Sequence, residues 1–469
     1  MARKKQSLTP EEKLARALVP QDQQPYKLPK GWVWTRLGNI NFFKNKTLTP
    51  KQFPDEAFEM YSVPSFSDNY PEIVNGSEIG SSKQLVEKDD VLLCKINPRI
   101  NRVWKVYQYT KHQQLASSEW IVVRNHAILS DYLMWYFRCS YFREYMLSNV
   151  SGVGGSLMRA QPKFVKTYPV PLPPLPEQQR IVARIESLFA KLDAARDKLQ
   201  QVLDTQEARR AAILHEAFTG RLTGHKGSAE GRGKREEEGA QNPEGTEFVP
   251  EGWKKVKLTE VCAINPKKIS TKELDNSLKV SFFPMASLDE RLGKITKPEI
   301  RTLSEVKKGF TNFSEADVVL AKITPCFENG KAAIIGPLMN HIGYGTTEFF
   351  VLRSTQDLYN KFLFYFIRSP KFRSEAKAHM TGAVGQQRVP KDFIENYSFM
   401  LPPLEEQCRI VDILDSLLNK EYQASTIAQS SLSQIDLLKK SILARAFRGQ
   451  LGTQDPSDPD ARDLLTSDQ

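Results

Sequence analysis

The feature that most constrains this chain is a proline-led segment that occurs twice, each time at the start of a helical pattern. The first copy reads Leu-Pro-Pro-Leu-Pro-Glu-Gln-Gln-Arg-Ile-Val over residues 172–182, and the second reads Leu-Pro-Pro-Leu-Glu-Glu-Gln-Cys-Arg-Ile-Val over 401–411. Proline lacks a backbone donor and favours extended backbone before it, so each segment ends one element and starts another. The helical patterns also end alike, at Ala217-Phe218 with Gly220 and at Ala446-Phe447 with Gly449. Two long helices of one kind therefore organise the chain.

A matching front segment precedes each helix. Pro29-Lys30-Gly31-Trp32 returns as Pro250-Glu251-Gly252-Trp253, and Asp90–Pro98 returns as Asp317–Pro325. A repeat period above 200 residues indicates two copies of a domain pair rather than a solenoid. Short runs of Val, Ile, Phe and Tyr, broken by Gly, Pro and Asn, favour strands and turns in each front segment.

Each long helix carries a narrow apolar stripe whose spacing alternates between three and four residues. Such a stripe is typical of a coiled-coil seam, and the most direct partner is the other copy. At about 40 residues, each helix would be on the order of 60 Å long. The predicted seam residues are Val182, Ile185, Phe189, Leu192, Leu199 and Leu203 in the first helix, and Val411, Leu414, Leu418, Leu432 and Ile435 in the second.

These patterns predict seven segments, and the length of 469 residues favours several domains over one core. Apart from the two front domains and the two helices, the segments are rich in polar residues and charges. The predicted order is a loosely attached N-terminal arm (1–25), a first front domain (26–175), a first helix (176–224), a flexible charged linker (225–247), a second front domain (248–404), a second helix (405–450) and a disordered tail (451–469).

The overall charge indicates a polyanionic partner, with nucleic acid first, because the net charge is +11 and the pI is near 9.2. The five cysteines are scattered, form no CxxC pair and lie apart from the histidines, which argues against zinc and against a disulfide framework. The first residues lack a signal-peptide core, and no apolar run approaches the roughly 20 residues of a membrane span. We expect a cytoplasmic protein.

One candidate contact surface is the basic, aromatic stretch from Lys95 to Lys111. Its cations can neutralise phosphates, and Arg or Lys at a groove edge can read guanine. The alternative interpretation is a solvated strand face beside core aromatics. The predicted DNA-binding residues here are Lys95, Arg99, Arg102, Lys105 and Lys111, with Lys322 and Lys331 in the less basic second copy.

A second candidate is a glycine-rich loop that occurs in both halves, over residues 151–159 and 381–388. Glycine permits close backbone approach, and Arg or Gln can make bidentate contacts with bases. The alternative is an ordinary turn between a helix and a strand. The predicted DNA-binding residues are Arg159 and Lys163 in the first copy, and Gln386, Gln387, Arg388 and Lys391 in the second.

Catalytic patterns are missing from the sequence. It has no Walker A motif and no strand-then-helix GxGxxG, and neither Asn97-Pro98 nor Asn265-Pro266 continues as an amino-methyltransferase tetrapeptide. Asp55-Glu56 and Asp90 could be considered nuclease carboxylates, but Asp90 recurs as Asp317 at a strand start, where a turn role is usual. Glu119 and Glu348 precede apolar strands and are interpreted as partners of a neighbouring Arg. We therefore expect no catalytic and no metal-binding residues.

The doubled Pro-Pro-x-x-Glu-Gln helix starts and Ala-Phe-x-Gly ends resemble the specificity subunit of type I restriction–modification systems, over residues 26–452. The resemblance implies an α+β fold: two mixed α/β target-recognition domains in a pseudo-two-fold arrangement, separated by two long antiparallel coiled-coil helices. Each domain would read one half of a bipartite site in double-stranded DNA, and the helices would fix the spacer.

The resemblance also implies the partners. Two methyltransferase subunits would dock on the helices, and restriction (motor-nuclease) subunits would join outside them, with no membrane involved. The assembled complex would be an adenine-N6 methyltransferase and ATP-dependent endonuclease. S-adenosylmethionine, ATP and Mg would bind the partner subunits, with no cofactor in this chain.

Two other functions remain open from the residues. A stand-alone restriction or modification enzyme would need its own catalytic site. A structural coiled-coil adaptor would have no DNA affinity, which a salt-dependent binding assay would reveal.

Overall fold

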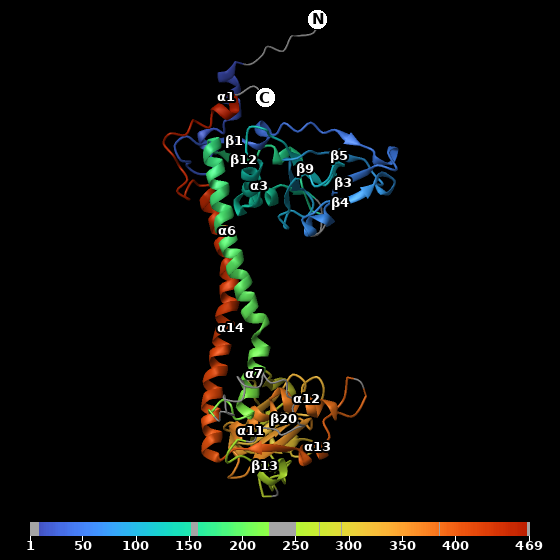
Figure 1. Ribbon diagram of the computed structural model, residues 1–469, viewed down its shortest axis with the longest axis vertical. Helices are drawn as coiled ribbons and strands as arrows, with labels where there is room; N and C mark the ends of the chain where they lie inside the picture. Colours follow the sequence, from blue (N-terminus) through green and yellow to red (C-terminus); the bar gives the residue numbers. More distant parts are fainter. Residues whose placement is uncertain are drawn as a thin grey trace, which may run out of the picture. The chain divides into compact units, whose positions relative to one another are not determined.

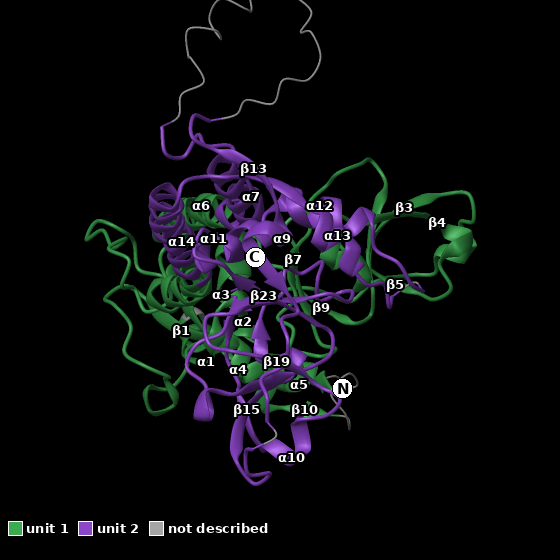
Figure 2. Ribbon diagram, turned by 90° about the horizontal axis from the view of Figure 1, so that it is seen from below, with its two compact units in different colours: residues 1–199, 430–469 green, residues 200–429 purple. Residues whose placement is uncertain are grey.

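The chain forms two compact units in the computed structural model, which describes residues 9–151, 158–224, 250–271, 273–291, 293–383 and 385–466. Unit 1 comprises residues 1–199 and 430–469, and unit 2 comprises residues 200–429 (Figure 2). Each unit therefore contains the first part of one long helical segment and the last part of the other. The predicted linker (225–247) lies outside the described residues.

The described part of unit 1 is built on two sheets and two strand pairs, β1-β12 and β10-β11 (Figure 1). One sheet has the order β2-β5-β8-β3-β4, with β3 and β8 parallel, and the other has the order β7-β6-β9. Strands β1 and β12 pair antiparallel. The bounds are β1 Val33–Arg36, β2 Thr47–Leu48, β3 Ala57–Tyr61, β4 Glu72–Asn75, β5 Lys83–Leu85, β6 Val91–Cys94, β7 Val103–Lys105, β8 Gln113–Ala116, β9 Trp120–Val123, β10 Val150–Ser151, β11 Arg159–Ala160 and β12 Pro169–Leu172.

Unit 2 repeats the central strand orders of unit 1, because β4-β3-β8-β5 corresponds to β18-β15-β22-β19 and β7-β6-β9 corresponds to β21-β20-β23. Its sheets have the orders β18-β15-β22-β19 and β14-β23-β20-β21, with β15 and β22 again parallel, and β13 pairs with β24. The bounds are β13 Lys254–Lys257, β14 Cys262–Ile264, β15 Lys279–Phe283, β16 Leu288–Asp289, β17 Lys294–Ile295, β18 Glu299–Thr302, β19 Thr311–Phe313, β20 Val318–Ala321, β21 Ala332–Ile334, β22 Gly343–Gly345, β23 Phe349–Ser354 and β24 Ser398–Leu401.

Short helices cover the sheets at matching places. Within each unit, the second helix of a pair is preceded by an N-cap residue, Cys139 before α4 and Ser369 before α12, whose side chain accepts a backbone N–H three residues on. The bounds are α2 Leu37–Ile40, α3 Ser130–Arg138, α4 Ser140–Ser148 and α5 Pro162–Val165 in unit 1, and α9 Leu258–Val261, α10 Leu303–Val306, α11 Asn360–Ile367, α12 Pro370–Ala378 and α13 Lys391–Asn396 in unit 2. We call these matching strands and helices the shared frame.

The shared frame is held by apolar packing. Strands β6 and β20 read Val-Leu-Leu-Cys and Val-Val-Leu-Ala and are buried on both faces, so alternation of apolar and polar residues is absent there. The helices α3 and α11 pack on them with Tyr132, Phe137, Phe362 and Ile367 in the two cores. These cores fix the loops that connect the strands.

The long helical segments are α6 (Leu175–Asp204) followed by α7 (Gln206–Phe218), and α14 (Leu404–Ala446). In unit 1, Asp193 pairs with Lys439 at 2.5 Å and Arg196 pairs with Asp436, so the helices run antiparallel there. In unit 2, Arg209 pairs with Glu421 at 3.0 Å. The predicted first helix is thus interrupted at Thr205, whereas the second is continuous.

A buried carboxylate near the start of each long helix links three distant segments. In unit 1, Glu177 accepts hydrogen bonds from Trp32 Nε1 at 2.7 Å and from Thr453 Oγ1 at 3.1 Å. In unit 2, Glu406 accepts hydrogen bonds from the indole of Trp253 at 3.1 Å and the hydroxyl of Thr223 at 2.8 Å. Each carboxylate therefore joins its front domain to the end of the other long helical segment.

The glutamine that follows makes a second repeated link. Gln178 accepts the Leu129 N–H and donates to the Pro173 carbonyl, both at 2.9 Å. Gln407 likewise accepts the Tyr359 N–H at 2.8 Å and donates to Pro402 at 2.9 Å. These bonds explain why the Glu-Gln pair recurs after the prolines.

Two sequence predictions are wrong about the ends of the chain. The arm is not loosely attached: helix α1 (Pro10–Ala17) is followed by Val19, which is buried and donates to the Trp34 carbonyl at 2.9 Å. The described part of the tail is ordered, because Ala461 is buried and Arg180 pairs with Asp458. Figure 1 shows α1 beside the C-terminal segment that carries α15 (Asp463–Thr466), in agreement with their contacts. Apolar side chains of both ends, among them Leu18, Leu464 and Leu465, pack against the core of unit 1, and the polar composition around them concealed these contacts.

The apolar stripe of each long helix packs in a domain core along its first part and is mostly half-buried farther along. Val182 and Ile185 belong to the core of unit 1 together with Leu443, and Val411 and Leu414 belong to the core of unit 2. Farther along, Leu192, Leu199, Leu203 and Leu432 are half-buried and Ile435 is buried. The first part of each stripe thus packs into a front domain as well as against the other helix, which the periodicity alone did not distinguish.

The Trp32–Glu177 bond predicts a local loss of stability when the indole donor is removed. Trp32→Phe should lower the free energy of unfolding of unit 1 by about 1–3 kcal/mol, because a buried acceptor loses a partner. Amide hydrogen exchange should become faster in β1 and stay unchanged in β13. For Trp253→Phe, exchange should become faster in β13 and stay unchanged in β1.

Trp104→Phe is the matched control, since Trp104 is buried and its Nε1 has no hydrogen-bond partner among the described residues. An equal effect of Trp104→Phe on β1 would show that ring volume, and not the hydrogen bond, is responsible.

Candidate nucleic-acid interface

The structure brings together the two stretches that the sequence singled out. After β6, Asn97 N donates to the Met158 carbonyl at 2.7 Å and Ala160 N donates to the Lys95 carbonyl at 2.8 Å. The same ladder occurs in unit 2, where Thr324 N donates to Gln387 O and Val389 N donates to Lys322 O, each at 2.9 Å. The start of the basic stretch and the end of the glycine-rich loop therefore lie side by side in each unit, whereas Lys105 pairs with Val91 at the opposite end of β6.

An ion pair fastens the end of the glycine-rich loop in both units. Arg159 pairs with Glu119 at 3.3 Å, and Arg388 pairs with Glu348 through Nε and Nη2, at 3.0 and 2.9 Å. The hydrogen bonds from Arg388 lower the pKa of Glu348 below its usual range. The prediction that both glutamates are partners of a neighbouring Arg agrees with these contacts.

The loop of unit 2 shows why glycine is needed. Gly382 has a φ of 121° and Gly385 a φ of 82°, which are backbone conformations that side chains disfavour. A Cβ at Gly382 would approach the Gln386 carbonyl oxygen to 3.0 Å. Residues 152–157 of the first loop lie outside the described residues.

The predicted DNA-binding residues differ in their accessibility. Arg99, Lys111, Lys163, Gln386, Arg388 and Lys391 are exposed, whereas Lys95, Arg102, Arg159, Lys322, Lys331 and Gln387 are half-buried. Lys391 also pairs with Glu395 at 2.6 Å, within its own helix α13.

Lys105 is a correction to the predicted set. It is 8% exposed, and its ammonium donates to Asp131 at 2.8 Å and lies 3.5 Å from Asp89. A cation that is already paired and buried cannot neutralise a phosphate at the surface. Lys105 instead joins β7 to α3.

Arginines that the sequence reasoning missed support the loop between β6 and β7. Arg143 of α4 donates to the Arg99 carbonyl, and its counterpart Arg373 of α12 donates to the Glu328 carbonyl. The signal for them was present, since Arg138 and Arg143 recur as Arg368 and Arg373 at the same spacing. Arg143 and Arg373 therefore hold the backbone of these loops through hydrogen bonds to carbonyl groups, and we assign them no phosphate contact.

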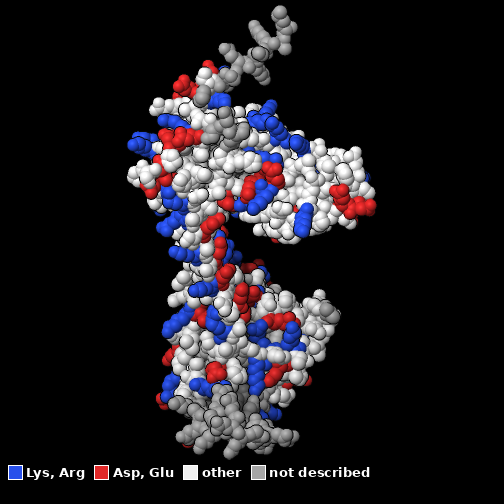
Figure 3. Space-filling view, turned by 45° about the horizontal axis from the view of Figure 1, so that its top comes forward, with Lys and Arg blue, Asp and Glu red and all other residues white. Residues whose placement is uncertain are grey.

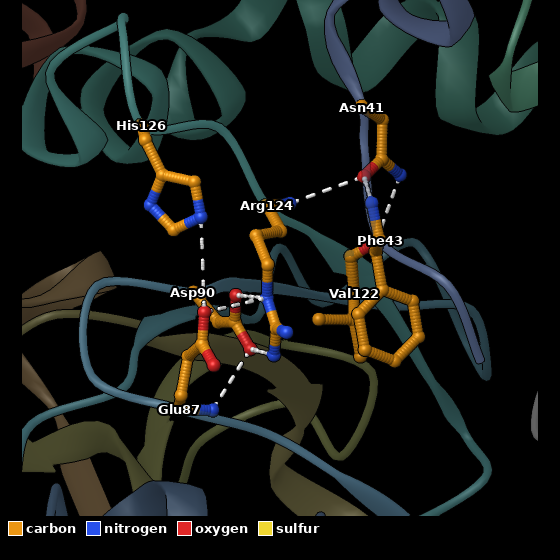
Figure 4. Close-up of polar contacts among 7 residues, drawn as sticks. All are labelled: Asn41, Phe43, Glu87, Asp90, Val122, Arg124 and His126. Atoms are coloured by element: carbon orange, nitrogen blue, oxygen red, sulfur yellow. Dashed lines mark hydrogen bonds and ion pairs between the residues drawn. The ribbon is translucent and has the colours of Figure 1, made fainter. Parts of the chain in front are cut away.

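Asp90, one of the carboxylates considered for nuclease chemistry, is engaged in structural contacts. Asp90 accepts two bonds from Arg124, at 2.7 and 2.6 Å, and one from Glu87 N at 2.9 Å (Figure 4). Arg353 makes the same bidentate pair with Asp317 in unit 2. Among the described residues, no group of three or more His, Cys, Asp or Glu side chains could hold a metal ion.

Charge on the surface is mixed. Figure 3 shows Lys and Arg interspersed with Asp and Glu over the face drawn, rather than gathered in one basic area. Interspersed charges favour contacts at particular loops over a continuous basic groove. In the described part of the chain, no helix is both long enough and apolar enough to cross a membrane.

Comparison with known proteins gives consistent results. The model of the type I restriction modification DNA specificity domain matches residues 29–204 and 250–429. The chain is 36% identical over 259 residues to the type I restriction enzyme EcoEI specificity subunit of Escherichia coli, which covers 46% of this chain and 43% of that relative. It is 21% identical to the EcoKI specificity subunit of E. coli strain K12, over 91% of both chains. The fold is similar to the HsdS subunit from Thermoanaerobacter tengcongensis, with a TM-score of 0.66, 22% identity and coverage of 92% of this chain and 100% of the other.

The Glu348–Arg388 ion pair leads to a prediction about the effects of Glu348→Gln and Arg388→Ala on DNA affinity. The N–H edge that a bidentate base contact would use is occupied by Glu348, so Arg388 should act first as the anchor of its loop. Glu348→Gln and Arg388→Ala should then weaken DNA binding to a similar extent, measured by titration of labelled duplex at several salt concentrations.

A different outcome would identify Arg388 as a base reader. In that case Glu348→Gln would free the guanidinium and preserve affinity, while Arg388→Ala would relax specificity at one position. Glu119→Gln serves as the matched control in unit 1.

Proposed function

The chain belongs to the family of type I restriction modification DNA specificity domains, and we propose that it is the sequence-reading subunit of a type I restriction–modification complex. In this proposal, each unit reads one half of a bipartite site in double-stranded DNA. The observation that carries the proposal is the shared frame, which occurs twice with the same strand order and different loops. A chain that reads two unlike half-sites needs this combination of a repeated support and divergent contacts.

The proposal assigns the parts of the chain as follows. Residues 26–175 and 248–404 are target-recognition domains, and residues 176–224 and 405–450 are spacer helices. Two methyltransferase subunits dock on the helices, and restriction subunits join the complex. The family match over both front domains supports this division.

Chemistry is assigned to the partners. Methylation of adenine, ATP hydrolysis and cleavage belong to them, as does the binding of S-adenosylmethionine, ATP and Mg. Support comes from Asp90 and Asp317, which are held by Arg124 and Arg353 and are therefore structural. Carboxylates that serve a metal or a water need free lone pairs.

The exposed cations have a defined role in the proposal. Arg99, Lys111, Lys163 and Lys391 contact phosphates and set the position of each unit on the duplex, whereas base edges are read by loops that differ between the units. Arg159 and Arg388 occupy equivalent places with equivalent partners, so they cannot account for a difference between two half-sites.

Sequencing of methylated adenines tests the proposal directly. A host that carries this gene with its methyltransferase partner should show one bipartite methylated motif that disappears when the gene is deleted. The same motif after deletion would contradict the proposal. Salt-independent or undetectable binding of the complex to duplexes with the motif would favour the adaptor function instead.

The long helices are proposed to set the spacer. Helix α14 has 43 residues, which at 1.5 Å per residue is about 65 Å. Because Arg196 pairs with Asp436 and Arg209 pairs with Glu421, positions near Leu203 and Ala428 face each other in the antiparallel numbering.

A paired insertion tests the spacer role. Four residues added after Leu203 and four after Ala428 lengthen both helices by roughly 6 Å and keep the stripes nearly in phase. Methylation mapping should then show a spacer longer by about one or two base pairs, with both half-sites unchanged. An unchanged spacer would exclude the helices as the ruler. Insertion after Leu203 alone is the control, since it shifts the two stripes out of register.

A further inference from the structure

Three tyrosines form an exposed cluster on unit 1. Tyr70, Tyr107 and Tyr109 are 46%, 39% and 40% exposed, respectively. The ring centroids of Tyr70 and Tyr109 lie 4.6 Å apart, and those of Tyr107 and Tyr109 lie 6.0 Å apart. Grouped aromatic rings that are exposed at a surface are typical of a contact site, because they offer large area at low conformational cost.

The loop that carries two of these tyrosines, residues 106–112 between β7 and β8, is held by buried polar groups. Tyr107 N donates to the Tyr61 hydroxyl at 3.1 Å, and that hydroxyl donates to the Tyr107 carbonyl at 2.5 Å. Glu59 of β3 is fully buried, and its carboxylate accepts the Thr110 N–H and a bond from Gln114 Nε2. A satisfied buried network of this kind fixes the loop in advance of any contact.

Unit 2 anchors its corresponding loop, residues 335–342 between β21 and β22, at the equivalent strand position. Strand pairing aligns Glu59 with Ser281, because β3 pairs with β4 and β8 in the register that β15 uses with β18 and β22. The Ser281 hydroxyl accepts the Met339 N–H at 2.9 Å, and the Asn340 side chain donates to the Lys279 carbonyl at 2.8 Å.

The side chains that the two loops expose are unlike. The β7–β8 loop presents Tyr107 and Tyr109, with the exposed Lys111 beside them. The β21–β22 loop presents Met339, which is 42% exposed, together with Asn340 and His341. The anchor is therefore kept while the exposed side chains differ.

We infer that the β7–β8 loop, with Tyr107 and Tyr109 supported by Tyr70, contacts the bases of one DNA half-site, and that the β21–β22 loop does so for the other. The inference rests on the proposed function. Tyrosine can pack on a thymine methyl or a deoxyribose, and its hydroxyl can donate to or accept from a base edge. Lys111 supplies a neighbouring phosphate contact.

The exposed side chains of the β7–β8 and β21–β22 loops differ, and this difference favours DNA over a protein as the molecule that the loops contact. A subunit that binds both units in the same way needs a surface that they share, and these loops are where the units diverge. A bipartite site presents each unit with a different base sequence. Reading such a site requires two loops that are held at the same place in each unit but expose different side chains.

The test compares substitutions in the two loops within the full chain, assembled with its methyltransferase subunits. Tyr107→Ala with Tyr109→Ala should lower affinity for the cognate duplex by at least about fivefold and relax methylation at positions in one half-site. Met339→Ala with Asn340→Ala should affect the other half-site. Phe53→Ala, which removes an exposed aromatic ring of unit 1 that lies outside the β7–β8 loop and outside the long helices, is the matched control and should change neither.

Three results would overturn the inference: an unchanged methylated motif, an equal loss of affinity for cognate and random duplexes, or unchanged DNA binding with loss of a subunit from the complex. The last would make the cluster a protein contact. Each is distinguishable from failure of the proposed function, in which the unsubstituted complex would methylate no bipartite motif. Equal thermal unfolding of variant and parent shows that the exposed substitutions leave the fold intact.

Discussion

A buried carboxylate hydrogen-bonded to an indole and a hydroxyl is the interaction on which both units depend. Glu177 and Glu406 each occur near the start of a long helix and receive a donor from the front domain and one from the end of the other helical segment. Burial raises the pKa of Glu177, which reflects the cost of holding a charge away from water. The hydrogen bonds offset that cost in the assembled unit. Neither unit can therefore complete its core without parts of both helices.

Stability and specificity are separated within each unit. The shared frame repeats its strand order, its ion pairs between Asp and Arg, and its glutamine links. The loops that the frame supports carry tyrosines in one unit and Met339, Asn340 and His341 in the other. Because a loop side chain at the surface contributes little to the core, it can vary without loss of the fold. This separation suits a protein that must read different sequences with one architecture.

The sequence predicted the features that repeat. The doubled Pro-Pro-x-x-Glu-Gln segment predicted the long helices, and the family resemblance that it carries implied two mixed α/β domains. The glutamates Glu119 and Glu348 were correctly assigned to arginine partners. It failed where a contact joins distant residues without a pattern. Lys105 meets Asp131 across 26 residues, so nothing near Lys105 indicates that its charge is buried. The arm packs through backbone bonds such as Val19 to Trp34, which leave no mark on hydropathy. The tyrosine loop was noticed as aromatic, but its anchor Glu59 is visible only once β3 and β8 are paired.

An exchange of one front domain for the other tests the account most directly. Leu37 N donates to Tyr168 O at 2.9 Å, and Leu258 N donates to Tyr397 O at 2.8 Å, so residues 258–397 can replace 37–168 at matched junctions. The exchange keeps β1, β12, the arm and both Glu-Gln pairs. If each unit reads its half-site independently on a shared frame, methylation mapping of a host with this chain should show a symmetric motif made of two copies of the unit 2 half-site. Retention of the original asymmetric motif, or loss of all methylation by a folded and fully assembled complex, would contradict the account.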